Sequence, residues 1–248
     1  WHFNLYKFFM ASKARLFYPK ELKSGFISKF SENQSHYIKN VIRLKHGDKI
    51  SLFNSKDGEW DASIILNQKD LIEFKVEKMS RHKEEEKNIW LAFSPIKKNP
   101  QDLMIQKTTE LGVNKFIPVI CERSVVREIN IDRTKKIYIE ASEQSNRISV
   151  PEILEKQNLQ NFLKNFPNDG NLLFCDINSK SNNFINLISK SVPTCILVGP
   201  EGDFSEKERE LIENHKRTKS ISLARNILRA ETAAIAAATI VSYKLNFS

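Results

Sequence analysis

Two short segments near the C-terminus combine charged side chains with residues that shape the backbone. They are Leu197-Val-Gly-Pro-Glu-Gly-Asp-Phe204 and Leu223-Ala-Arg-Asn-Ile-Leu-Arg-Ala-Glu-Thr232. Each segment follows a short apolar run and precedes a helical pattern, which predicts a loop at the carboxyl end of a strand. Because parallel α/β sheets bind ligands at such ends, the two loops indicate a ligand site.

The first loop is shaped by proline and glycine. Pro200 fixes its own φ and Gly202 can take a positive φ, so the turn is rigid and exposes backbone groups. Backbone N–H and C=O groups of this kind can recognise the polar edge of a purine. The alternative is an ordinary turn of an α/β fold, and the tetrapeptide 199–202 taken by itself favours that turn.

The second loop places Arg229 and Glu231 where the next helix begins. An arginine at the carboxyl end of a strand in a basic protein is suited to binding an anion. The alternative is a structural ion pair between Arg229 and Glu231, with Thr232 as the helix cap. Residue type and spacing leave both interpretations open.

Residues 10–79 predict a small, β-rich, barrel-like domain. Asp57-Gly58 indicates a hairpin, and Ser31 with Gln34 matches a capping box at the start of a helix. Residues 80–87 are charged and without apolar side chains, which indicates a linker and a domain boundary. The strands that we expect here are 14–18, 49–54, 60–66 and 71–76.

Residues 80–248 alternate strand and helix patterns, which predicts an α/β domain with a mostly parallel sheet. Gly112 ends the first helix, Ser205 and Glu208 form a second capping box, and an alanine-rich final helix packs closely in the core or against a second subunit. The expected strands are 89–95, 116–121, 172–176, 194–199 and 220–224. The expected helices are 101–111, 132–145, 182–190, 205–216 and 232–245.

The composition narrows the class of protein. A net charge of +9 over 248 residues favours a polyanionic partner, although simple solubility explains it equally well.

No apolar run reaches the length of a membrane span, and no dinucleotide, P-loop or nucleophile-elbow motif is present. The 3 cysteines and 5 histidines lack ligand spacing, so we expect reduced thiols in a cytoplasmic protein and no metal. Residues 1–9, which precede Met10 and carry no signal-peptide pattern, are left out of the fold expectations.

Further segments along the chain add to the information in the two loops. They are Arg15-Leu-Phe17, His36-Tyr-Ile-Lys-Asn-Val-Ile-Arg-Leu-Lys45 with Gly47-Asp48, Gln106-Lys-Thr-Thr-Glu-Leu-Gly-Val113, Glu122-Arg-Ser124, and Glu143-Gln-Ser-Asn-Arg147 with Pro151. Together with the loops, this ordered series resembles the SPOUT class of methyltransferases over nearly the whole chain from residue 14. The closest resemblance is to the RsmE family of 16S ribosomal RNA uracil-N3 methyltransferases.

The resemblance implies a PUA-like RNA-binding β-barrel followed by a SPOUT domain with a deep trefoil knot. It implies a homodimer that acts on 16S ribosomal RNA or the small ribosomal subunit and holds S-adenosylmethionine in the knot, with the active site near the subunit interface. Three loops would supply the cofactor contacts: Phe174, Cys175, Val198, Gly199, Gly202, Asp203, Leu223, Ala224 and Leu228.

The same resemblance implies roles for charged residues. Arg229 would stabilise the negative charge that develops on the uracil carbonyl. Glu201 or Glu231 would accept the N3 proton or hold that arginine, unless both are purely structural. RNA would contact basic residues that otherwise form a solvated face: Arg15, Lys39, Arg43, Lys45, Lys107, Arg123, Arg147 and Arg225.

Three positions depart from the family pattern. Asp203 and Ala224 stand where the family usually has glycine, and Asn226 stands where it usually has arginine. The loss of that arginine leaves its role to Arg225 or Arg229. Two other functions stay open: a SPOUT enzyme that methylates another RNA atom, such as a ribose 2′-hydroxyl, and a non-catalytic ribosomal RNA-binding assembly factor.

Overall fold

The chain forms two compact units. A computed structural model describes residues 14–66, 71–85, 87–179 and 184–247, so the expectations about residues 1–9 and Met10 lie outside the described residues. The first unit comprises Trp1–Glu85 and Asn146–Val150, and the second comprises Glu86–Ser145 and Pro151–Ser248. Among the described helices, none is long and apolar enough to cross a membrane.

The first unit contains a five-stranded sheet in the order β1-β3-β4-β5-β2. Its core is apolar on alternate strand positions, and the predicted hairpin is confirmed, with Gly58 at φ 83°. The predicted capping box at Ser31 is also confirmed. The strands and helices are β1 (Arg15–Phe17), β2 (Ile27–Lys29), α2 (Glu32–His36), the π-helix η1 (Tyr37–Val41), β3 (Lys49–Asn54), β4 (Gly58–Ile65) and β5 (Glu73–Arg81).

Strand β5 differs from the expectation because it continues through the charged residues to Arg81. Backbone pairing with β4 explains the extension, since Met79 pairs with Trp60 and Arg81 with Glu59. The short strand β2 was not expected, because only three of its residues pair with β5. Ladder hydrogen bonds of this kind leave no hydropathy signal in the sequence.

The second unit contains a seven-stranded sheet in the order β12-β10-β11-β6-β7-β8, with β9 also paired to β7. Every pairing in it is parallel, so the predicted α/β class with a parallel sheet is confirmed. The strands are β6 (Ile89–Phe93), β7 (Lys115–Ile120), β8 (Glu152–Ile153), β9 (Gln157–Asn158), β10 (Asn171–Cys175), β11 (Thr194–Val198) and β12 (Thr218–Ile221).

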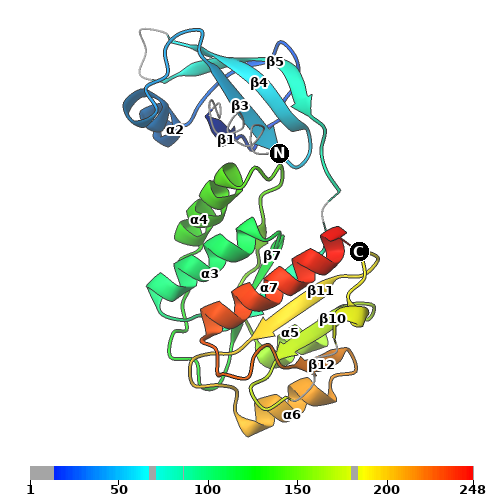
Figure 1. The fold of residues 1–248 in the computed structure, drawn as a ribbon. Helices are drawn as coiled ribbons and strands as arrows, with labels where there is room; N and C mark the ends of the chain where they lie inside the picture. The colour runs from blue at the N-terminus through cyan, green and yellow to red at the C-terminus, as the bar shows by residue number, and fades with distance from the viewer. Residues whose placement is uncertain (1–13, 67–70, 86, 180–183, 248) are drawn as a thin grey trace. The chain divides into compact units, whose positions relative to one another are not determined.

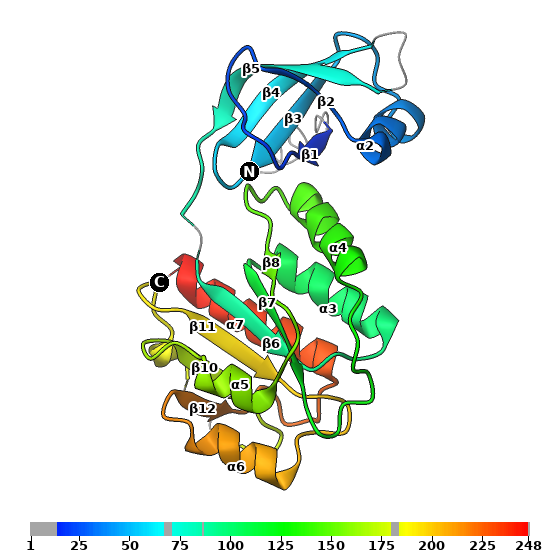
Figure 2. The ribbon, with the colours of Figure 1, turned by 180° about the vertical axis from the view of Figure 1, so that it is seen from behind.

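Helices cover both faces of this sheet. Helices α3 (Lys98–Glu110) and α7 (Ala230–Phe247) pack together on one face, with α7 in front of β11 in Figure 1, and α4 (Ile131–Gln144) packs against α3. Helices α5 (Leu159–Lys164) and α6 (Glu206–Asn214) lie on the other side, which faces the viewer in Figure 2. In α7 the alanines at 233, 234, 237 and 238 are buried, which lets the helix approach β6, β11 and α3 closely as predicted.

The expected helix at 182–190 is wrong over the described residues. Only a 3₁₀ turn, η2 (Ile185–Leu187), forms there, and residues 182 and 183 lie outside the described part. The hydroxyl of Ser189 accepts a hydrogen bond from the Ser191 N–H at 3.3 Å, so the side chain competes with a helical backbone partner. The short helix α5, capped by Asn158, was not expected.

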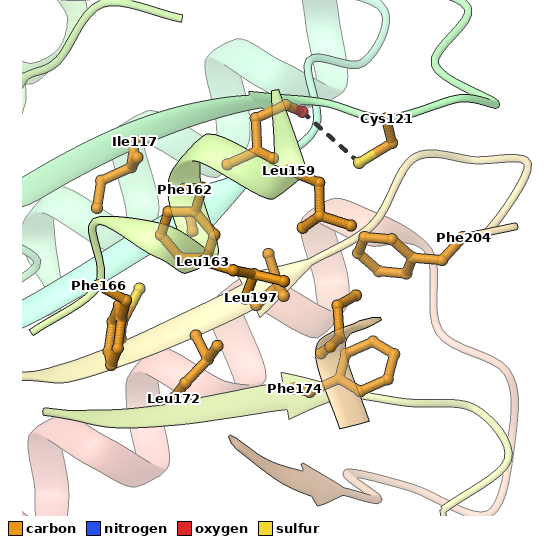
Figure 3. Packing of buried hydrophobic residues seen from close by; sticks show 14 residues of the cluster. Ile117, Cys121, Leu159, Phe162, Leu163, Phe166, Leu172, Phe174, Leu197 and Phe204 are labelled. Atoms are coloured by element: carbon orange, nitrogen blue, oxygen red, sulfur yellow. Dashed lines mark hydrogen bonds between the residues drawn. The ribbon is translucent and has the colours of Figure 1, made fainter. Parts of the chain in front are cut away.

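The core between the sheet and α5 and α6 lies directly beneath the loops of interest. Figure 3 shows aromatic and aliphatic side chains from β7, α5, β10 and β11 that converge there. Phe174 and Phe204 point toward one another in this view, with ring centroids 5.3 Å apart and planes at 83°. The cysteines at 121, 175 and 195 are free thiols, as predicted.

Candidate active site

Three neighbouring strands end at one edge of the sheet. β10 ends at Cys175, β11 at Val198 and β12 at Ile221, and the order β12-β10-β11 makes these strands adjacent. The loops after β11 and β12 belong to the two segments 197–204 and 223–232. Their predicted position at strand carboxyl ends is confirmed.

Two connected clefts lie among these loops. The inner cleft, of about 430 Å³, is lined by the residues after β10 and by 221–228. The outer cleft, of about 1550 Å³ including its open mouth, is lined by 198–201, Asp203, 227–231 and Ala233, together with residues at the start of α3. Both clefts share five residues, so they form one continuous site: Cys175, Ile177, Ile227, Leu228 and Ala233.

The structure brings most of the expected cofactor residues into these clefts. The inner cleft is lined by Cys175, Leu223, Ala224 and Leu228, and the outer cleft adds Val198, Gly199 and Asp203. The other two expected residues line neither cleft. Phe174 is fully buried beneath the loops, and a Cβ at Gly202 would lie 3.4 Å from Arg123.

Gly199 is required by packing. A Cβ at this position would lie 2.5 Å from Cε2 of the buried Phe204 ring, which no real side chain tolerates without displacement. The left-handed backbone residue of the loop is Asp203, at φ 58°, and not Gly202, which is a correction to the sequence prediction. A non-glycine residue in this conformation stores strain of about 1 kcal/mol.

The charged residues expected to act in catalysis all line the outer cleft. They are Glu201, Arg229 and Glu231. Within the described part of the chain, no ion pair joins Arg229 to Glu231. Helix α7 begins at Ala230, so Thr232 lies inside the helix and its expected role as the cap is wrong. The carbonyl of Arg229 accepts the first helical hydrogen bond, from Ala233 at 2.8 Å.

The start of helix α3 orients the carboxylate of Glu201. Its Oε1 accepts a hydrogen bond from the backbone N–H of Lys97, the residue before α3, at 3.4 Å. A carboxylate is favoured there because the helix N-terminus carries a partial positive charge. The carboxylate therefore lies between the loop after β11 and the start of α3.

Several lining residues were not foreseen in the sequence. Ile96 and Lys97 follow β6, and Val125 follows β7, so they extend from the same edge of the sheet as the three loops. The signal that would have found them is the strand-end rule applied to β6 and β7 as well as to β10, β11 and β12. Pro100 and Ile177 also line the outer cleft and were not among the expected residues.

Arg15, expected to bind RNA, has partners within the first unit. Its Nε lies 3.1 Å from Glu59 Oε2, its side chain is 10% exposed, and its guanidinium carbon lies 3.8 Å from the centre of the Phe53 ring. It also donates a hydrogen bond to the carbonyl of Arg147. These contacts make Arg15 a structural residue of the first unit.

The other expected RNA contacts fall into two groups. Lys39, Arg43, Lys45 and Arg225 are exposed, and Arg225 lines the inner cleft. The remaining three contact protein groups. Arg123 donates to the carbonyl of Phe204 at 3.3 Å, Lys107 pairs with Glu110 at 2.9 Å, and Arg147 donates to Ser149 at 3.0 Å.

Comparison with known families agrees with this architecture. Residues 83–242 match the RNA methyltransferase domain, and residues 30–77 match the RNA methyltransferase PUA domain. The chain therefore belongs to the RNA methyltransferases that join a small PUA domain to an α/β catalytic domain. Within that class it belongs to the ribosomal RNA small subunit methyltransferase E family, so the expected family is confirmed.

Individual relatives support the assignment. Ribosomal RNA small subunit methyltransferase E from Rickettsia conorii is 40% identical, over 84% of this chain and 85% of its own length. The protein of the same name from Bacillus subtilis is 29% identical, over 84% and 87%. The crystal structure of a ribosomal RNA small subunit methyltransferase E from Neisseria gonorrhoeae bound to S-adenosyl methionine has a TM-score of 0.86 and 28% identity, covering 95% of this chain and 100% of that chain.

Proposed function

We propose that this protein transfers the methyl group of S-adenosylmethionine to N3 of a uridine in 16S ribosomal RNA. The observation that carries the proposal is the convergence of three strand-end loops on one continuous site with Arg229, Glu201 and Glu231 at its outer part. Membership of the family and the cofactor present in the Neisseria gonorrhoeae structure support it.

The inner cleft suits a nucleoside cofactor in its chemistry. Apolar walls with a few polar groups are typical of small-molecule sites. Ile177, Leu223 and Leu228 supply apolar walls, and the backbone groups of 222–228 supply donors and acceptors. When bound, S-adenosylmethionine supplies a methyl group on a positively charged sulfur.

The charged side chains of the outer cleft suit a weakly acidic substrate atom such as N3 of uracil. Uracil N3 carries a proton, so the base must pass toward its anion before the nitrogen can act as a nucleophile. Arg229 stabilises the negative charge that develops on the adjacent carbonyl, and Glu201 or Glu231 accepts the proton. N3 lies on the Watson–Crick edge, so the target uridine must be unpaired or flipped out.

RNA binding is assigned to exposed basic residues in each unit. In the first unit these are Lys39, Arg43 and Lys45, in and after η1, and in the second unit Arg225 lies at the inner cleft. Each would neutralise backbone phosphates. A protein that acts on ribosomal RNA is expected in the cytoplasm.

A homodimer and the deep trefoil knot remain part of the proposal. Ile227 is 82% exposed and Val125 is 74% exposed, and both line the outer cleft. Large apolar side chains beside a site are suited to coverage by a second subunit. Light scattering during chromatography measures the oligomeric state directly.

The decisive test is the methylation state of 16S ribosomal RNA. Mass spectrometry of RNA from cells with and without the gene is expected to show one 3-methyluridine that depends on it. Calorimetry with S-adenosylmethionine is expected to show binding by the purified protein. Binding together with a methyl group on another atom would identify a different target, and absence of binding would favour an assembly factor without catalysis.

A further inference from the structure

Arg209 on α6 joins two loops of the candidate site. Its Nη1 forms an ion pair with Asp176 Oδ1, just beyond β10, and its Nη2 lies 2.8 Å from Asp203 Oδ2, in the loop after β11. Asp176 lines the inner cleft and Asp203 lines the outer cleft. One guanidinium therefore connects both parts of the site.

The bridge is partly buried and further constrained by its surroundings. The side chains of Asp176 and Arg209 are 4% and 18% exposed, so water screens their attraction less than at an open surface. Asp176 Oδ1 also accepts the backbone N–H of Asn178 at 2.9 Å. The guanidinium carbon of Arg209 lies 5.5 Å from the centre of the buried Phe174 ring.

Asp203 needs such support because of its backbone. It has φ 58°, a conformation that glycine adopts freely and that most other residues adopt only under constraint. Its Oδ1 accepts the N–H of Phe204 at 2.8 Å, while Oδ2 pairs with Arg209. Both carboxylate oxygens thus hold the residue in the left-handed conformation.

We propose that Arg209 is a positioning residue that holds the loops after β10 and β11 in the arrangement that binds the cofactor. Both of its terminal nitrogens are engaged by carboxylates, so it acts through the loops and not by direct contact with the ligand. In this chain the pair Asp203 and Arg209 stabilises a turn whose backbone conformation glycine would adopt without support. The inference rests on the proposed cofactor site, and it concerns how that site is held.

The test compares four forms with the wild type: Arg209→Met, Arg209→Lys, the double variant Asp203→Gly with Arg209→Met, and the control Lys207→Met. Lys207 lies on the same helix, is exposed and lines neither cleft of the site. Calorimetry measures the Kd for S-adenosylmethionine. Amide hydrogen exchange of the cofactor-free protein measures the opening of residues 176–179 and 199–205.

For Arg209→Met we expect a Kd about tenfold higher and faster exchange confined to the two loops. Arg209→Lys keeps one charge contact and is expected to fall between Arg209→Met and the wild type. The double variant is expected to recover part of the affinity, because glycine adopts the turn at 203 without strain, while Asp176 still lacks its guanidinium partner. Lys207→Met is expected to match the wild type.

Two results would overturn the inference. One is wild-type affinity and wild-type loop exchange in Arg209→Met, and the other is a double variant as weak as Arg209→Met. If Arg209→Met fails to fold, Arg209→Lys and the double variant give the same comparison. If the wild type itself does not bind S-adenosylmethionine, the proposed function fails, while hydrogen exchange in the free protein still decides whether Arg209 holds the loops.

Discussion

The ring of Phe204 packs against Gly199 so closely that a Cβ at position 199 would lie 2.5 Å from Cε2 of the ring. Phe204 is 3% exposed and packs edge-on against Phe174 of β10. The loop after β11 is therefore folded back onto the core of the second unit. Because Gly199 has no Cβ, the ring of Phe204 can pack this closely against it, beside the outer cleft.

Gly199→Ala is expected to disturb the outer cleft, because it disrupts the packing of the loop after β11 against Phe204. The added methyl group must displace the Phe204 ring or the loop, at a cost of about 1–3 kcal/mol. We expect a lower urea midpoint and a Kd for S-adenosylmethionine roughly tenfold higher or more. Gly202→Ala is the matched control, because its Cβ would lie 3.4 Å from its nearest neighbours and require only small shifts. Equal effects of the two substitutions would contradict the packing argument.

Arg229→Ala is expected to reduce methylation strongly and leave cofactor binding intact. Removal of one preorganised group that stabilises developing charge costs about 10²–10³ in kcat. Single-turnover assays with 16S ribosomal RNA measure the chemical step, and calorimetry measures the affinity for S-adenosylmethionine. Arg225→Ala serves as a comparison, with weaker RNA binding and a smaller loss in the chemical step. Near-normal turnover of Arg229→Ala would remove this residue from the mechanism.

Arg15 and Lys45 are expected to respond differently to substitution by alanine. Arg15→Ala leaves the buried Glu59 with the more distant Arg81, at 3.3 Å, so the first unit should lose about 2–4 kcal/mol of stability. Lys45→Ala should keep the stability and reduce the slope of log affinity for RNA against log salt by about 1. Thermal unfolding and salt-dependent RNA binding measure the two effects. A stable Arg15→Ala variant with only weaker RNA binding would reverse the assignment.

The stability of the protein is expected to fall at high pH because of buried thiols. Burial, and next the negative charge of Glu208, raise the pKa of Cys121 to about 12, above its ordinary value near 9. Between these values the unfolded chain releases a proton that the folded chain retains. The free energy of unfolding therefore decreases as pH rises from about 9 to 12, by up to about 1.4 kcal/mol per pH unit for one thiol.

Urea titrations at several pH values above 8 measure this slope. Burial acts in the same direction on Cys175 and Tyr138, and their pKa values are also raised to about 12. The comparison with Cys121→Ala isolates one thiol, because that variant should show a shallower decline. An identical slope in both proteins would show that Cys121 ionises as easily when folded as when unfolded.

Local signals in the sequence were sufficient for much of the fold. Ser31 and Ser205 start helices with complete capping boxes, and Gly112 has φ 99° after α3, because these features depend on neighbours within a few residues. The extension of β5 and the short strand β2 depend on a partner strand distant in sequence. Pairing of that kind has no local pattern, so the sequence did not reveal it.

For the site, sequence patterns alone were enough to predict the family, the parallel α/β class and the two loops that follow β11 and β12. Tertiary structure decided which of their side chains reach the clefts and which support them. Phe174 is expected from sequence to touch the cofactor but lies in the core, and Arg15 is held by Glu59 within the first unit. The bridge from Arg209 to Asp176 and Asp203 spans 33 and 6 residues along the chain. Only folding brings such groups together, because charge pairing and close packing depend on distances in space and not on spacing in sequence.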